Sequence, residues 1–385
     1  MASAATTLHA PAFLRWRHQR WPRASWARWV LRIAVAIPFV ALTDVAYSAN
    51  GASPGNRALH HQAATLRWAN GHLGWVAHSF PPIPLSIARV FPGGAQGLAI
   101  AGALCTGILI QLTIERMILR SVPISTAVVL ATSVVGTPIF WFLATQDFTT
   151  FLTLSLLSVA LTGLLDFTFN RSTESGFIAG IGFGLACLCD VAAVPFAIAG
   201  ALATLFVAPQ TRAGREIARR RAAATVVLFP TAAVMSGWAF LQWRFTGSWT
   251  ASFRQADPSL FGFGGGVWGS LEHSVTAVGT DLVFVPVLIA ASVMLLARRP
   301  SSLMASVAFL GCVILDLWLG ARLSSETVVV LLGVVALAML PERLSFTERA
   351  TLWGCVVAQV AVAFVGLHHG LTPVAGWLHR LATVG

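Results

Sequence analysis

Long apolar runs dominate the chain, and they constrain its fold more than any other feature. Only 10% of the residues are charged and 56% are hydrophobic, whereas soluble domains carry about 25% charge. The sequence therefore predicts an all-α polytopic membrane protein with about ten to twelve transmembrane helices. It excludes a soluble globular domain, a disordered chain and a disulfide-stapled secreted module. The eleven runs of about membrane-spanning length are 29–47, 94–115, 121–144, 148–166, 176–190, 192–208, 222–241, 281–297, 301–321, 325–340 and 350–367.

The fifth and sixth runs are short for two full crossings of a membrane. A full span needs about 20 residues, and together 176–190 and 192–208 fall short of two such spans. Asp190 and Pro195 lie close to the point where they meet. We expect either two short helices or one broken or re-entrant pair around these two residues.

The arginines indicate how the chain is oriented. All 25 basic residues are arginine, and the net charge is +11. With the N-terminus in the cytoplasm, 18 arginines fall on the cytoplasmic side and seven outside, as the positive-inside rule requires. We therefore expect a basic cytoplasmic segment, residues 1–27, and one multi-span domain, residues 28–385, in the plasma (inner) membrane of a bacterium. Because the arginines flank apolar runs, the expected partner is the lipid bilayer and not nucleic acid.

Two connections are long, and this topology places both on the outer side. They are the first and fourth outer loops, residues 48–93 and 242–280. Both are rich in aromatic residues, including Trp68, Trp75, Trp243 and Trp249. Aromatic side chains next to a membrane are typical of interfacial helices and substrate platforms. The segment from Ala63 to Trp75 is the predicted surface helix of the first loop.

Two aspartates are the candidate catalytic residues. Asp44 lies at the outer end of the first run, three residues before Tyr47, the only tyrosine of the chain. A carboxylate at this depth is costly unless it is hydrated or paired, so it marks a functional position, although a helix-end carboxylate facing water is the alternative. Asp147 lies in the next outer turn, where its alternative role is to cap the helix that follows.

Basic side chains and histidines could hold an anionic substrate near these carboxylates. The candidates for phosphate or substrate binding are Arg57, Arg67, Arg244, Arg254, His60, His61 and Tyr47. The planar guanidinium suits phosphate, although contact with lipid headgroups is the alternative. Histidines beside carboxylates also allow a divalent metal cation, but the spacing matches no strong metal signature. Asp190 and Asp316, inside apolar runs, indicate either an ion pathway or structural partners.

Five features, taken in order along residues 28–280, resemble the GT-C-type membrane glycosyltransferases, such as protein O-mannosyltransferases and aminoarabinose transferases. Two departures accompany the resemblance: Val45 stands where many relatives have Glu, and Cys189-Asp190-Val191-Ala192 stands where many have Arg-Pro-Ser-Ala. The five features are Asp44 with Tyr47, a first outer loop whose helix-like run Ala63–Gly71 leads to Phe80-Pro81-Pro82, Asp147 in a short loop, the glycine-rich stretch Gly180–Ala186, and the turn Gln242–Trp249.

The resemblance implies transfer of a sugar from a polyprenyl-phosphate carrier at the outer membrane face. Asp44 would activate the acceptor hydroxyl, and Arg57, Arg67, Arg244 or Arg254 would neutralise the departing phosphate. Neither the sugar nor the acceptor is specified. Two other functions stay open: a secondary transporter or flippase, which intramembrane Asp190 and Asp316 favour, and a non-catalytic subunit of degenerate glycosyltransferase type.

Overall fold

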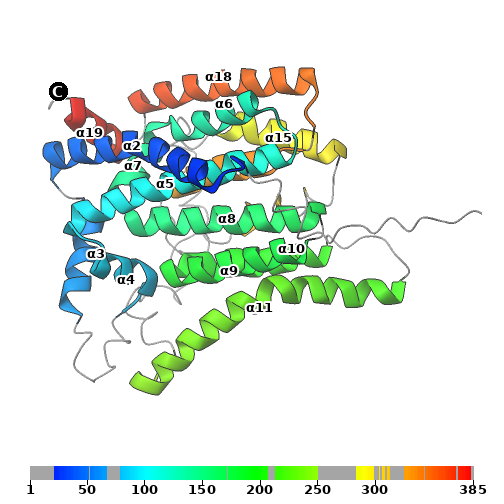
Figure 1. Cartoon of the computed structure of the whole chain (residues 1–385), viewed down its shortest axis with the longest axis horizontal. Helices are drawn as coiled ribbons and strands as arrows, with labels where there is room; N and C mark the ends of the chain where they lie inside the picture. The colour runs from blue at the N-terminus through cyan, green and yellow to red at the C-terminus, as the bar shows by residue number, and fades with distance from the viewer. Residues whose placement is uncertain are drawn as a thin grey trace, which may run out of the picture.

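The chain forms a bundle of helices that lie roughly along one common direction (Figure 1). Every regular element in the described ranges is a helix, so the prediction of an all-α polytopic membrane protein is confirmed. The computed structural model describes residues 21–51, 53–66, 79–170, 172–206, 213–249, 283–298, 325–341, 343–369 and 372–382, with a few positions between 303 and 312.

The helices of the bundle follow the predicted apolar runs. Within the described residues, four segments are long and apolar enough to cross a membrane: Ser25–Ala49, Gly94–Leu119, Phe148–Thr168 and Arg221–Thr246. Run 301–321 is described only at scattered positions, which are helical. The helices at the other ten runs are α2 (Ser25–Asn50), α5 (Gly94–Leu119), α6 (Ile124–Val135), α7 (Pro138–Gln146), α8 (Phe148–Asn170), α9 (Thr173–Cys189), α10 (Val194–Phe206), α11 (Ala213–Thr246), α15 (Val285–Arg298), α17 (Ser325–Ala338) and α18 (Phe346–His369).

The run 121–144 is a broken helix rather than a straight one. Helices α6 and α7 meet at an angle of 67° and together pass as one bent span, which raises the number of possible long spans to five. The break falls at Gly136 and Thr137, directly before Pro138. Proline disfavours the helical conformation in the residue that precedes it, and Thr137 is accordingly extended, with φ −81° and ψ 138°.

The fifth and sixth runs form two short helices with a break between them, at Asp190 and close to Pro195. A single turn of 3₁₀ helix, Val191–Ala193, joins α9 to α10. The carboxylate of Asp190 accepts a hydrogen bond of 2.9 Å from the backbone N–H of Ala192, and so caps this turn. Asp190 therefore stabilises the turn that joins the two helices.

Helix α9 packs closely against a neighbour on each of two sides because it is rich in glycine. On one side, a Cβ atom at Gly180 would lie 2.3 Å from the carbonyl oxygen of Val227 in α11. On the other, a Cβ at Gly182 would lie 3.0 Å from the Cβ of Ala160 in α8. Small residues let helix backbones approach closely in membranes. The glycine-rich stretch predicted from the sequence is therefore a packing surface.

Buried ion pairs tie helices together where α5 and α8 end. We call this the arginine end, defined by Arg28, Arg116, Arg120, Arg298 and Arg343. Asp166 of α8 is 3% exposed and pairs with both Arg116 and Arg120 of α5. The Arg120 guanidinium also donates to the carbonyl oxygens of Ala338 and Leu340 at the end of α17. These residues thus join three helices.

A second ion pair at the arginine end fixes the start of α18. Ser345 and Glu348 form a capping box, in which Glu348 accepts from the Ser345 N–H at 2.7 Å. The carboxylate of Glu348 also receives two hydrogen bonds of 2.7 Å from Arg298 of α15. Burial alone raises the pKa of Glu348, but the hydrogen bonds from Ser345 and the charge of Arg298 outweigh it and hold the pKa below its ordinary value.

The opposite end of the bundle, which we call the loop end, carries two short helices. They are α3 (Pro54–Thr65) and α4 (Pro82–Val90), and they share a small apolar core with α5 and α8. Of the predicted surface helix from Ala63 to Trp75, only the first four residues are described: Ala63–Thr65 form the end of α3, and Leu66 is extended. Ser53 supplies the start signal, since its hydroxyl caps α3 by accepting from Asn56 N–H. Residues 67–75 lie outside the described ranges.

Candidate functional site

The candidate residues of the first span, Asp44 and Tyr47, lie at the loop end of α2. Asp44 is exposed on α2, and its Oδ1 accepts a hydrogen bond of 3.4 Å from the side-chain amide of Gln96 in the first turn of α5. Tyr47, one turn later, is 43% exposed. Helix α2 stops at Asn50 because Gly51 takes a positive φ of 67°, which favours glycine. The chain then turns back into α3.

Asn56 fastens α3 over this end of the bundle. Its side chain is 1% exposed. The carbonyl oxygen of that side chain accepts from Phe148 N–H at 3.0 Å, and its amide donates to the carbonyl oxygen of Thr145 at 3.5 Å. A further bond, from Gln62 to the carbonyl oxygen of Phe80, joins α3 to the segment that precedes α4. Sequence reasoning missed Asn56, because the backbone groups that its side chain binds are 89 and 92 residues away in the chain.

One exposed side of α3 is basic. Arg57, His60 and His61 are all exposed, and their spacing of three and four residues places them on one side of the helix. His60 lies against the start of α5, because a Cβ atom at Gly94 would be 3.4 Å from its Nε2. His60 and Asp44 therefore border the same first turn of α5 from two different helices.

Asp147 has a structural task in this arrangement. It precedes α8, and its Oδ1 accepts from Thr150 N–H at 3.1 Å, while its Oδ2 accepts from the Thr150 hydroxyl at 2.7 Å. Both oxygens therefore serve the N-cap that was its alternative role. Asp147 also lies beneath α3, because a Cβ atom at Gly55 would be 3.8 Å from its Cγ.

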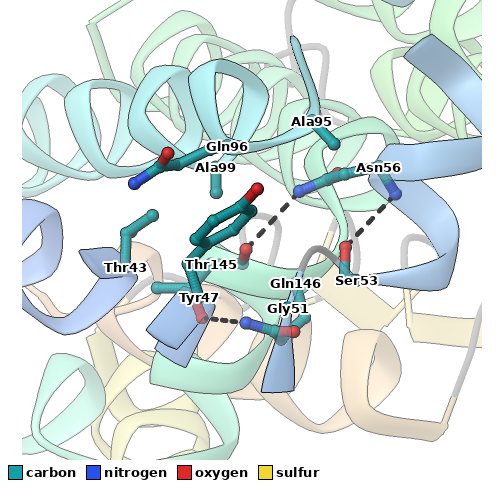
Figure 2. A pocket seen from close by; sticks show the side chains of 10 residues that line it. All are labelled: Thr43, Tyr47, Gly51, Ser53, Asn56, Ala95, Gln96, Ala99, Thr145 and Gln146. Carbon is teal, nitrogen blue, oxygen red and sulfur yellow. Dashed lines mark hydrogen bonds between the residues drawn. The ribbon is translucent and has the colours of Figure 1, made fainter. Parts of the chain in front are cut away.

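A small polar hollow lies among these elements. Figure 2 shows the ring of Tyr47 in the middle of the side chains that line it. The hollow encloses about 210 Å³ with its mouth, but the space for the centre of a water molecule is about 10 Å³, roughly enough for one water. A sugar ring does not fit inside it. Its lining residues are Thr43, Tyr47, Gly51, Ser53, Asn56, Ala95, Gln96, Ala99, Thr145 and Gln146.

The structure does not bring every predicted residue to this site. Arg244 is exposed at the end of α11, where its guanidinium lies 5.9 Å from the ring centroid of Phe245. Helix α11 packs on α9 and α10 and not on α2, α3 or α5. Arg67, Arg254 and Asp316 lie outside the described residues. Among the residues that the structure does describe, no three His, Cys, Asp or Glu side chains gather closely enough to hold a metal ion.

Comparisons with known proteins add no further constraint on the site. No family model, no curated protein and no solved structure matches this chain. The residues at the loop end therefore carry the functional inference.

Proposed function

We propose that the chain is a membrane glycosyltransferase, which moves a sugar from a polyprenyl-phosphate carrier to an acceptor hydroxyl at the loop end. In this proposal the loop end faces outward from a bacterial plasma membrane. The observation that carries the proposal is the exposed carboxylate of Asp44, oriented by Gln96 and next to Tyr47. The order of motifs along residues 28–280 is the second support.

The reaction assigns a task to each group at the site. Asp44 accepts the proton of the acceptor hydroxyl while the hydroxyl oxygen attacks the anomeric carbon of the sugar. The bond from that carbon to the phosphate oxygen breaks, and the lipid phosphate leaves with the electron pair. The nearby carboxylate stabilises the oxocarbenium-like transition state electrostatically. Because the hollow holds about one water, the sugar lies at its mouth, beside Tyr47.

The departing phosphate needs positive charge, and the basic face of α3 supplies it. Arg57, His60 and His61 are exposed on that face, and His60 lies against the start of α5. The imidazole N–H of His60 and the planar fork of Arg57 can donate hydrogen bonds to a phosphate. Asp147 is a positioning residue in this proposal, since both of its oxygens hold the start of α8.

The test compares three matched variants in membranes that contain equal amounts of the full-length protein. Asp44→Asn keeps the shape and removes the charge, so transfer from radiolabelled polyprenyl-phosphate sugars should fall by roughly 10² or more. Asp147→Asn keeps a good N-cap, and should retain activity within a few-fold. Asp190→Asn also keeps a cap and should leave sugar transfer intact, whereas a transporter that uses Asp190 would fail.

Two outcomes would contradict the proposal. Full activity of Asp44→Asn would remove Asp44 from the mechanism. Absence of transfer by the unmutated protein, over a panel of polyprenyl-phosphate sugars and acceptors, would leave the non-catalytic subunit as the better description.

A further inference from the structure

The first part of the chain carries positive charge without a single carboxylate. Six arginines precede Asp44, which is the first acidic residue of the sequence. Three of them lie at the start of α2 or directly before it, and the other three belong to residues 1–20, outside the described ranges. Any compensation of this charge must therefore come from acidic groups elsewhere. The six arginines are Arg15, Arg17, Arg20, Arg23, Arg28 and Arg32.

Neutral atoms surround the guanidinium of Arg28. It donates to the carbonyl oxygens of Pro22 at 2.9 Å and Arg23 at 3.1 Å, and to the hydroxyl of Ser25 at 2.8 Å. The side chain of Arg23 is exposed. No ion pair joins either arginine to a carboxylate among the described residues. Both charges are therefore uncompensated within that part of the chain.

The carboxylates near the arginine end are already engaged or lie on other helices. Asp166 and Glu348 form the ion pairs described above. Glu115 is buried, and it accepts a hydrogen bond of 2.6 Å from the side-chain amide of Gln111. Glu174 is in the first turn of α9, which packs on α8 and α11 and not on α2. The bundle therefore does not supply a counter-charge for the start of α2.

This basic region lies at the depth of the lipid headgroups. The part of α2 that is apolar enough to span a membrane begins at Ser25, so Arg23 and Arg28 lie within about one helical turn of its border. Trp26 and Trp29, in the same part of α2, are 71% and 56% exposed. Exposed tryptophans at the end of a span are typical of the membrane–water interface. The uncompensated arginines therefore lie at the level where the phosphates of the lipids are found.

We propose that the start of α2, together with the basic stretch before it, is a docking surface for the headgroups of anionic phospholipids. The charges of Arg23 and Arg28 attract the net negative charge of the lipid, while Trp26 and Trp29 hold the surface at headgroup depth. Each arginine near an anionic membrane surface strengthens the attraction about fivefold. This inference depends neither on the proposed glycosyltransferase site nor on which side of the membrane the arginine end faces.

The first test measures the headgroup preference at this surface. The full-length protein is reconstituted in phosphatidylcholine nanodiscs that contain a trace of phosphatidylglycerol or phosphatidylcholine with a diazirine next to the headgroup. Cross-linked peptides are identified by mass spectrometry. On residues 21–32, adducts of phosphatidylglycerol should exceed adducts of phosphatidylcholine by about fivefold or more. Raising KCl from 0.1 M to 1 M shortens the Debye length from about 10 Å to about 3 Å and should lower this excess.

The second test removes charge without removing a described side-chain contact. Arg23→Gln should lower the excess of phosphatidylglycerol adducts by up to about fivefold. Replacing Arg15, Arg17, Arg20 and Arg23 together by glutamine should lower it further. Arg89→Gln, at an exposed arginine of α4 at the loop end, makes the same change of charge and is the matched control. It should leave the excess unchanged.

Three outcomes would overturn the proposal. One is equal labelling of residues 21–32 by the two lipids. Another is an excess of phosphatidylglycerol adducts that neither Arg23→Gln nor the fourfold replacement lowers. The third is loss of these adducts when polyglutamate or RNA is added at an equal concentration of negative charge, which would assign the surface to an acidic macromolecule.

Discussion

Replacement of Asp166 by asparagine should destabilise the protein strongly while changing almost no volume. The carboxylate of Asp166 is 5% exposed and neutralises two arginines, of which Arg120 is 7% and Arg116 is 22% exposed. Removing one partner of a buried ion pair costs about 3–5 kcal/mol, because an uncompensated charge stays behind. The partial exposure of Arg116 places the expected loss at the low end, about 3 kcal/mol.

The assay is thermal unfolding of the purified protein in detergent, followed by the fraction that stays monomeric in size-exclusion chromatography. With about 2 °C per kcal/mol for a large chain, the midpoint should fall by roughly 6 °C. The control is Arg298→Gln, which breaks a pair whose arginine is 34% exposed and should cost about 1 kcal/mol or less. Equal shifts in the two variants would refute the argument that burial makes the Asp166 pairs strong.

Three further predictions concern single contacts. Because the pKa of Glu348 is lowered, its stabilising contribution is present above its ordinary pKa of 4.5 and is lost as the pH falls through the lower folded value. Glu348→Gln should therefore lower the melting temperature at pH 7 and converge with the unmutated protein toward pH 3. Gly107→Ala would set a Cβ 2.1 Å from a carbonyl oxygen of α2 and should cost about 1–3 kcal/mol or more, whereas Gly237→Ala, with open space around it, should be neutral or stabilising by up to about 1 kcal/mol. Asn56→Ala leaves a buried backbone N–H of α8 without its acceptor, which should cost about 1–3 kcal/mol and speed hydrogen exchange in residues 54–65.

Composition and apolar run length were enough to predict the fold class and the positions of most helices. Lipid cannot satisfy backbone hydrogen bonds, so a long apolar run has almost no alternative to a helix. Local signals also predicted structure. Asp147, three residues before Thr150, caps α8, which was the alternative role given to it from the sequence. Ser53-Pro54 was an equally local start signal for α3, and the sequence analysis overlooked it.

Contacts between distant segments could not be predicted in the same way. Asp166 lies 46 residues from Arg120, and their pairing depends on the rotation of α5 and α8 about their own axes. Hydropathy is nearly uniform around both helices, so no polar face marks that rotation. The hydrogen bond between Asn56 and Phe148, 92 residues apart, could not be predicted either, because it also joins distant segments. The polar hollow depends on the contacts of Asn56, so among its lining residues only Tyr47 was a candidate from the sequence, and its shape could not be predicted.

The glycines of α9 have a consequence for how variation among related sequences would be interpreted. A Cβ atom at Gly180 would lie 2.3 Å from a backbone oxygen of α11, and one at Gly182 would lie 3.0 Å from Ala160 of α8, so a larger side chain is disfavoured on two faces of one helix. Selection should hold these positions nearly invariant even in a homologue that has lost all activity. Invariant glycines in α9 would then indicate close packing of helix backbones, and they would not be evidence for a catalytic role. Variation at Asp44, which is exposed and contacts only a flexible amide in the described structure, is the more informative indicator of whether a homologue keeps its chemistry.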